Sequence, residues 1–205
     1  MLLGMSSVKP ARTRPTRDEV RHRILDAALE VFAASGFAGA TIDAIGRTAG
    51  FTKGAVYSNF ESKDELFLAL LDRQFESRGE LIATAIDNSA DTAAAARALS
   101  HAILDSIHDQ DRYYLVLTEF WLRAVRDPQL RERLLARRRA AVEQAVHVVQ
   151  ATGTELPRRN LLGLAQLVVT ITTGIAMEEM LAPGTIDEDI LTRLTAALLE
   201  PAPER

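Results

Sequence analysis

The sequence contains no cysteine, which excludes a disulfide framework, a cysteine-ligated metal centre and a thiol nucleophile. Glycine and proline are scarce, with 11 and 7 among 205 residues, and aromatic residues make up only 5%. A chain with few helix breakers and many Ala, Leu, Arg and Glu residues favours helices over strands. Hydrophobic residues reach 47% and charged residues 25%, as in ordinary globular proteins, so extensive disorder is also excluded.

A large net charge is missing as well, since the total is only −4, but the charges are unevenly distributed. Residues 1–63 carry nine Lys/Arg against six Asp/Glu, a net of +3, and the other 142 carry fifteen against twenty-two, a net of −7. This pattern suggests a head that binds a polyanion on a body with another task. Residues 1–15 form a basic arm that we expect to be flexible; alternatively, the arm follows a phosphate backbone or enters a minor groove.

Long hydrophobic runs are absent, with one exception. Residues 161–177 carry no charge, and the length of this run is the shortest that could span a membrane as a helix. Glycine, threonine and glutamine residues make the run less hydrophobic than a typical spanning helix. A helix buried on two sides explains this run more simply. The N-terminus lacks the pattern of a signal peptide. We therefore expect a cytoplasmic protein with no membrane partner.

Helix caps and apolar periodicity predict an all-α fold of about nine helices without a strand. The helices are expected to begin near residues 16, 41, 52, 62, 91, 111, 127, 157 and 185. The first is expected to end at Gly36, the sixth at Arg126 and the seventh at Gly153. Short loops between helices predict a bundle of antiparallel neighbours. Capping boxes are expected at three starts: Thr16 with Glu19, Ser62 with Glu65, and Thr185 with Glu188.

Residues 41–60, TIDAIGRTAGFTKGAVYSNF, predict two short helices that meet at Gly50, where a tight turn requires a positive φ. Ile45 and Val56 are eleven residues apart and can pack together where the helices cross steeply, and little room is expected at Gly46. This is the layout of a helix-turn-helix, whose second helix can enter a major groove. We therefore divide the chain into the arm (1–15), a helix-turn-helix head (16–61), a larger helical body (62–200) and a flexible tail (201–205).

The exposed face of the second short helix is polar and carries short side chains. Asn can read adenine and Ser can bond to either base. Gly54 costs about 1 kcal/mol of helix propensity, which makes sense if a backbone must approach closely. The predicted DNA contacts on this face are Thr52, Lys53, Gly54, Ser58 and Asn59. The predicted phosphate donors are Thr41, Arg47, Tyr57 and Lys63.

Residues 16–75 resemble the DNA-binding domain of the TetR family of transcriptional regulators. The matching motifs are AASGF at 33–37, TI at 41–42, AGF at 49–51, KGAVY at 53–57, NF at 59–60 and SKDEL at 62–66. Gly46 departs from the alanine often found in the family. The rest of the chain resembles the family's ligand-binding and dimerisation domain only in its layout.

The resemblance implies a dimer whose two heads bind successive major grooves of a near-palindromic operator, with half-sites about 34–36 Å apart. It also implies that the last two helices form the dimer interface and that a ligand in the body shifts the long fourth helix. The alternative interpretation is that the residues that could supply the interface belong to the intramolecular core, and many of them must do so. These candidates are Leu164, Leu167, Val168, Ile171, Ile190, Leu191, Leu194 and Leu198.

Candidate ligand-pocket residues are aromatic or soft and apolar, typical of a small-molecule cavity, although ordinary core explains each of them as well. They are Tyr113, Tyr114, Phe120, Trp121 and Met177. Glu119 and Glu178 could select a cation if they were buried, and residues 137–139 are expected to be a solvated arginine run. His101, Asp105 and His108 share a helix face, but we expect no metal, cofactor or catalytic site.

We therefore expect a DNA-binding transcriptional regulator and not an enzyme. The most direct interpretation is a homodimeric repressor that binds double-stranded DNA and is released by a small, largely apolar effector. One alternative is a regulator of the same fold that acts as an activator or without small-molecule control. Another is a small helical enzyme or lipid-binding protein with an incidental helix-turn-helix pattern.

Overall fold

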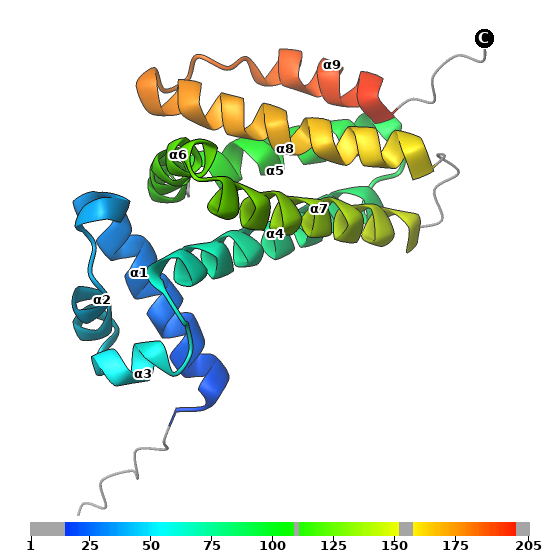
Figure 1. Cartoon of the computed structure of the whole chain (residues 1–205). Coiled ribbons are helices and arrows are strands. Elements are labelled where there is room, and N and C mark those ends of the chain that lie inside the picture. The colour runs from blue at the N-terminus through cyan, green and yellow to red at the C-terminus, as the bar shows by residue number, and fades with distance from the viewer. Residues whose placement is uncertain (1–14, 109–110, 152–157, 200–205) are drawn as a thin grey trace, which may run out of the picture.

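The computed structural model describes residues 15–108, 111–151 and 158–199. In this part of the chain it contains nine helices and no strand, which confirms the predicted all-α class (Figure 1). The helices are α1 (Arg17–Gly39), α2 (Ile42–Ala49), α3 (Lys53–Tyr57), α4 (Lys63–Asp87), α5 (Thr92–His108), α6 (Asp111–Arg126), α7 (Pro128–Ala151), α8 (Arg158–Leu181) and α9 (Glu188–Leu199). The predicted arm at 1–15, apart from Pro15, and the tail at 201–205 lie outside the described residues.

Helices α1 to α3 form a small head at one end of the molecule (Figure 1). The α1 helix begins with the predicted capping box, in which Thr16 N–H donates to Glu19 Oε2 at 2.7 Å and Glu19 N–H donates to Thr16 Oγ1 at 3.2 Å. Its regular part ends where expected, because Gly36 has a φ of 69° and a ψ of 162°. One further turn reaches Gly39 before α2 starts.

The body is a bundle of the six remaining helices. The α4 helix leads from the head into this bundle, where α7 packs along it, and α5 packs against α9 (Figure 1). Helices α8 and α9 both lie on the side of the body that is turned away from the head (Figure 1). The head and the body share one apolar core, since α1, α4 and α6 contribute neighbouring buried residues to it.

Four phenylalanines join the head to the body within that core. The rings of Phe67 on α4 and Phe120 on α6 stack with centroids 3.9 Å apart. Phe37, at the end of α1, lies edge-on to both rings, with centroids 6.0 Å and 5.3 Å away. Phe32 stacks on Phe37 at 5.1 Å. All four are at least 96% buried, so this cluster fixes the end of α1 against α4 and α6.

The predicted capping box at the start of α4 is only half formed. Ser62 Oγ accepts a hydrogen bond from Glu65 N–H at 3.1 Å, as expected of an N-cap. The Glu65 carboxylate does not return to Ser62, because it binds Arg133 at 2.6 Å and Arg137 at 3.1 Å on α7. Two arginines on a neighbouring helix replace the local partner, so Glu65 connects α4 to α7.

The capping box predicted for the last helix, Thr185 with Glu188, is wrong. The α9 helix begins at Glu188, and Asp187 Oδ1 accepts hydrogen bonds from Asp189 N–H at 2.8 Å and Ile190 N–H at 3.2 Å. The Thr185 hydroxyl instead donates to the Ala182 carbonyl at 2.6 Å. The buried Glu179 carboxylate organises this loop, since it accepts the N–H groups of Gly184 at 2.8 Å and Ile186 at 3.0 Å.

Candidate nucleic-acid interface

The turn between α2 and α3 has the geometry that the sequence predicted. Gly50 has a φ of 74°, in the left-handed region, and Phe51 N–H donates to the Gly46 carbonyl at 2.8 Å. Ile45 and Val56 are completely buried. A Cβ at Gly46 would lie 3.0 Å from the Phe51 carbonyl oxygen and 3.4 Å from Val56 Cγ2, so the expected lack of room is confirmed. The two helices therefore cross at close contact.

Two arginines of α1 pack against the helix-turn-helix, one at the turn and the other at Phe60, which follows α3. Arg23 Nη2 donates to the Ala49 carbonyl at 2.9 Å, at the end of α2, and its guanidinium lies 4.6 Å from the Phe51 ring centroid. The Arg21 guanidinium lies 4.5 Å from the Phe60 ring centroid. Neither contact was predictable from the sequence, because each joins residues far apart in the chain and leaves no local pattern.

Seven of the nine predicted DNA contacts are exposed, and Asn59 and Lys63 are partly buried. Thr41 and Thr52 are the N-caps of α2 and α3, where their hydroxyls accept the N–H groups of Ala44 at 3.1 Å and Ala55 at 3.2 Å. A Cβ at Gly54 would have a single neighbour, Thr52 Oγ1 at 3.9 Å. The packing of the head therefore gives no reason for glycine at this position. The exposed contacts are Thr41, Arg47, Thr52, Lys53, Gly54, Tyr57 and Ser58.

Several of these side chains already have partners within the head. Arg47 forms an ion pair with Asp43 one turn earlier in α2. Asn59 Nδ2 donates to the Ala55 carbonyl at 2.8 Å and lies 3.3 Å from Ser58 Oγ. Ser58 Oγ donates to the same carbonyl at 2.8 Å. A bidentate contact of Asn59 with adenine would require its amide to leave these partners.

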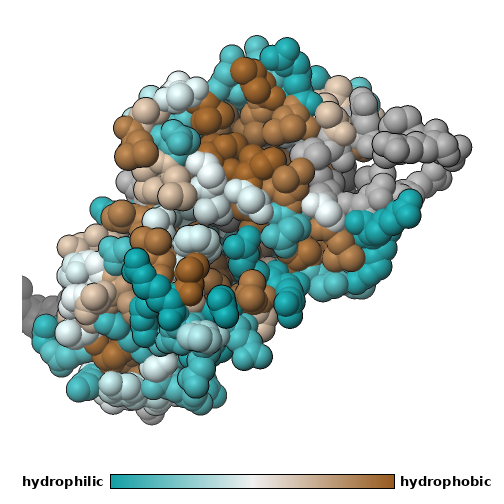
Figure 2. All heavy atoms as spheres, turned by 45° about the horizontal axis from the view of Figure 1, so that its top comes forward, coloured by the Kyte–Doolittle hydropathy of each residue, from teal (hydrophilic) through white to brown (hydrophobic). Residues whose placement is uncertain are grey.

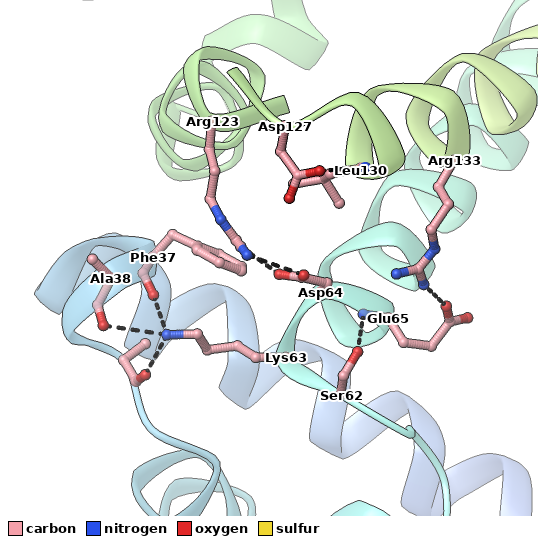
Figure 3. Close-up of polar contacts among 11 residues, drawn as sticks. Phe37, Ala38, Ser62, Lys63, Asp64, Glu65, Arg123, Asp127, Leu130 and Arg133 are labelled. Atoms are coloured by element: carbon pink, nitrogen blue, oxygen red, sulfur yellow. Dashed lines mark hydrogen bonds and ion pairs between the residues drawn. The ribbon is translucent and has the colours of Figure 1, made fainter. Parts of the chain in front are cut away.

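Among the nine predicted DNA contacts, Lys63 has the most hydrogen-bond partners within the protein. Its Nζ lies 2.6 Å from the Phe37 carbonyl, 3.2 Å from that of Ala38 and 2.9 Å from that of Ala40 (Figure 3). An ammonium group has three donors, and these carbonyls can take all of them. Burial lowers the pKa of Lys63 below its ordinary value, and Arg123 lowers it further, while Asp64 raises it. The phosphate role of Lys63 stays a prediction, and this geometry does not support it.

Comparison with known proteins identifies both parts of the chain. Residues 24–70 match the family model described as bacterial regulatory proteins, tetR family. Residues 90–201, more than half of the chain, match the tetracyclin repressor-like C-terminal domain. The chain belongs to the TetR family. It is therefore a DNA-binding helix-turn-helix regulator of transcription from a non-enzymatic family.

Individual relatives of this TetR-family regulator differ in how much of it they match. The transcriptional activator FasR of Mycolicibacterium smegmatis is 29% identical over 160 residues, which are 77% of this chain and 72% of FasR. The regulator SrpR of Pseudomonas putida is 52% identical, but over 60 residues only, which are 29% of this chain and 28% of SrpR. High identity is thus confined to a short segment, and long coverage comes with lower identity.

Solved structures with the same fold include two regulators named FadR, one of which is described as a fatty acid degradation regulator. The protein from Bacillus halodurans is 17% identical, with a TM-score of 0.65 over 95% of this chain and 100% of the other. The protein from Bacillus subtilis, in complex with stearoyl-CoA, is also 17% identical, with a TM-score of 0.63 over 87% of this chain and 96% of the other. Identity this low demonstrates a common fold and nothing further.

The five predicted pocket residues of this TetR-family chain are not brought together. Tyr113 and Tyr114 are buried with ring centroids 5.4 Å apart, and Phe120 belongs to the aromatic core, whereas Trp121 and Met177 are 48% and 43% exposed. The described residues line an open groove of about 720 Å³ between the head and the body, and none of the five is among its lining residues. Its lining residues are Glu30, Ala33, Ala34, Ile107, Arg112, Leu115, Glu179, Met180 and Pro183.

The predicted interface residues divide into exposed and buried ones. Leu167, Ile190 and Leu194 are 39%, 57% and 42% exposed. Val168 and Ile171 are partly buried, and Leu191 belongs to the core, as the alternative interpretation anticipated. The side chains of Leu164 and Leu198 lie outside what the structure describes.

Exposed residues recur along α8 at 167, 170, 174, 177 and 181, which is one stripe at helical spacing. Ile190 and Leu194 continue this apolar surface on α9. We call it the α8/α9 face (Leu167, Met177, Leu181, Ile190 and Leu194), and Figure 2 shows apolar surface gathered where these helices lie. By length and hydropathy one described helix, Leu161–Leu181, could cross a membrane, but a helix of a soluble protein can pass the same test.

Arg137, Glu119 and His101, among the remaining charged candidates, have structural partners. Arg137 is not simply solvated, because it pairs with Asp72 and Glu65 on α4. Glu119 accepts a hydrogen bond from Phe37 N–H at 2.6 Å, and Glu178 is exposed. His101 Nδ1 lies 2.8 Å from Asp105 Oδ2, and the described residues contain no group of three side chains that could hold a metal.

Proposed function

We propose that this protein is a homodimeric repressor of the cytoplasm that binds a near-palindromic operator and leaves it when a largely apolar ligand binds. The observation that carries the proposal is the outward face of α3. Lys53, Gly54 and Tyr57 are exposed there, next to a turn that is packed tightly from behind. A polar helix face with one cation and an open glycine suits close contact with a major groove.

The α8/α9 face supports the dimer. Leu181 is 82% exposed and Ile190 is 57% exposed, although exposed apolar residues in such a stripe are unfavourable in water. A contiguous apolar patch on a soluble protein is typical of an interface with another protein. A second copy of the chain would cover the stripe by an isologous contact, in which the same face of both subunits forms the interface.

An activator is the second candidate. FasR, whose match covers 77% of this chain, is named as a transcriptional activator. AcnR of Corynebacterium diphtheriae is named as a repressor and is 36% identical, but its match covers only 31% of the chain. A promoter-reporter assay with and without the protein separates the two, because a repressor lowers transcription and an activator raises it.

We propose a long-chain acyl-CoA as the first ligand to test. The support is that the FadR structure from Bacillus subtilis holds stearoyl-CoA, whose acyl chain is a largely apolar group. Such a ligand can release DNA only if it binds the DNA-incompetent form more tightly than the competent one. A coupling of about 1–3 kcal/mol corresponds to a 5- to 150-fold loss of operator affinity.

The testing experiment is selection of random duplex DNA on the purified full-length protein at about 0.15 M salt, because protein–DNA affinity depends strongly on ionic strength. We expect enrichment of a near-palindrome with half-sites about one helical turn apart. The enriched duplex is then titrated with protein in the presence of stearoyl-CoA or free CoA. Release by stearoyl-CoA alone supports the apolar effector. Failure to enrich any palindrome contradicts dimeric operator binding, and an unchanged affinity with both additives contradicts only the choice of ligand.

A further inference from the structure

We propose that Glu119 and Arg123 of α6 fix the angle between the head and the body and thereby determine the half-site spacing of the operator. The proposal rests on the dimeric DNA binding proposed above. It concerns the last turn of α1, residues 36–40, which is held from two sides where α4 and α6 meet (Figure 3).

The first side is α4. Lys63, at its first position, donates to the carbonyls of Phe37, Ala38 and Ala40, which are otherwise free at the end of a helix. Its ammonium also lies 4.8 Å from the Phe37 ring centroid. These contacts connect the last turn of α1 to the start of the long helix that enters the body.

The second side is α6, where Glu119 makes the decisive contact. Its carboxylate accepts Phe37 N–H at 2.6 Å, a short charge-assisted hydrogen bond. A Cβ at Gly36 would lie 3.2 Å from both carboxylate oxygens, and Gly36 has a φ of 69°. The glycine therefore serves two purposes: it turns the chain, and it leaves the space that the carboxylate occupies.

Arg123, one turn further along α6, connects all three elements. Its Nη2 lies 3.1 Å from Asp64 Oδ2 at the start of α4, and its guanidinium lies 4.9 Å from the Phe37 ring centroid (Figure 3). Phe37 is thus held through its amide, its carbonyl and its ring. We call this arrangement the α6 clasp (Glu119 and Arg123 with Phe37, Lys63 and Asp64).

The clasp is suited to orientation more than to stability. The side chains of Arg123 and Asp64 are 43% and 25% exposed, and ion pairs this accessible to solvent contribute little to folding. Among the described residues, α1 provides the principal contacts between head and body, and these contacts go to α6 and α4. The α3 helix lies at the other end of the head (Figure 1), so a small rotation at the clasp moves it by a larger distance.

In a dimer, the separation of the two α3 helices depends on this angle in both subunits. The bases that α3 reads do not depend on it, because the face of α3 is built by the packing of the head alone. The clasp therefore predicts that spacing and base preference can be changed independently.

The experiment uses duplexes with the half-sites selected by the wild-type protein and spacers that increase by one base pair. We compare full-length wild type with Glu119→Ala and Arg123→Ala. The control variant is Glu132→Ala, which removes an exposed carboxylate from α7. Wild type and the control should share one preferred spacer. In both clasp variants the preferred spacer should change by at least one base pair, or the affinity ratio between the preferred spacer and its neighbours should fall at least threefold. The base preference within each half-site should stay unchanged.

The conservative variant Glu119→Gln retains an acceptor for Phe37 N–H and should retain the wild-type spacer. Should Glu119→Ala not fold, Arg123→Ala carries the test, since its ion pair is exposed. A folded clasp variant with the wild-type spacer and the wild-type selectivity overturns the proposal. Equal loss of affinity on every spacer also overturns it, because that result indicates a purely structural role. If the wild type itself selects no paired half-sites, the proposed dimeric function fails first, which is a distinct result.

Discussion

Residue 54 is an unusual place for a glycine, because a side chain there would meet almost nothing within the protein. The nearest heavy atom to a Cβ at this position is Thr52 Oγ1, 3.9 Å away. Gly54→Ala should therefore stabilise the head, by up to about 1 kcal/mol, since alanine is the better helix former. The methyl group of the new alanine points to where DNA must approach, so operator affinity should fall about tenfold.

Urea unfolding and a DNA titration measure the two effects of Gly54→Ala separately. The control is Gly79→Ala, another helical position, on α4, where a Cβ meets nothing within 4 Å and no DNA contact is expected. Unchanged operator affinity in a stabilised Gly54→Ala protein would show that α3 does not bring its backbone close to DNA.

Asp72 on α4 is an ion-pair partner that we expect to contribute nothing to stability at neutral pH. Burial raises the pKa of its carboxyl, the pairing with Arg137 lowers it, and Glu65 and Glu76 raise it, with a net increase. The folded state therefore binds this proton more tightly than the unfolded state. Stability falls as the pH rises from the ordinary carboxyl pKa through the higher folded value.

Asp72→Asn removes the partly buried charge while Arg137 keeps Glu65 at 3.1 Å. We expect a melting temperature at or above that of the wild type at neutral pH, with a difference that shrinks as the pH falls below the folded pKa and disappears below the ordinary carboxyl pKa. Thermal melts over a pH series measure this effect. A clear loss of stability at neutral pH would mean that the ion pair with Arg137 outweighs the burial of the carboxylate.

At the scale of elements, the α8/α9 face makes the dimer testable. Leu194→Glu places a charge in the middle of the proposed interface, where burying it without a partner is costly. We expect a folded monomer in light scattering at micromolar concentration and at least tenfold weaker operator binding. Leu135→Glu on α7 is the matched control, because Leu135 is 43% exposed, close to the 42% of Leu194. A Leu194→Glu protein that remains dimeric would place the interface elsewhere.

The helices could be predicted from the sequence wherever local signals decide their ends. The sixth helix was expected at 111–126 and is found at Asp111–Arg126, and Gly50 forms the predicted turn. The two failed capping boxes have different physical causes: distant ion-pair partners at the start of α4, and competing acceptors nearby in the chain at the start of α9. Glu65 leaves its capping box for arginines of α7. Asp187 caps α9 in place of Thr185, in a loop that Glu179 holds.

The candidate DNA-binding site was also predictable where local spacing decides it, and not where distant contacts do. The polar face of α3 follows from spacing within twenty residues, and four of its five predicted residues are exposed, while Asn59 is partly buried. Lys63 was assigned to phosphate by its charge alone, whereas its three carbonyl partners come from the end of another helix. Glu119 and Arg123 carry no sequence signal for their contacts, because Phe37 lies 82 residues before Glu119.

At the scale of the whole molecule, the aromatic cluster makes the head and the body one folding unit. Phe120 is completely buried, and its ring stacks on Phe67 at 3.9 Å and meets Phe37 of the head at 5.3 Å. Phe120→Ala removes the ring of α6 that meets both Phe67 and Phe37, which should lower the free energy of unfolding by about 3–5 kcal/mol. Because the lost contacts reach α1, hydrogen-exchange protection should fall in the head as well as in α4 and α6.

The control for Phe120→Ala is Leu122→Ala on the same helix. The Leu122 side chain is 46% exposed, so this substitution should lower the free energy of unfolding by less than about 1 kcal/mol. Calorimetry of the wild type should show a single transition, since a head joined to the body through a shared core has little reason to unfold alone. Two separate transitions, or a Phe120→Ala protein whose head keeps full protection, would show independent domains. In that case an effector bound in the body could not act on DNA through this core, and the hydrogen bonds and ion pairs of the α6 clasp would have to carry the coupling.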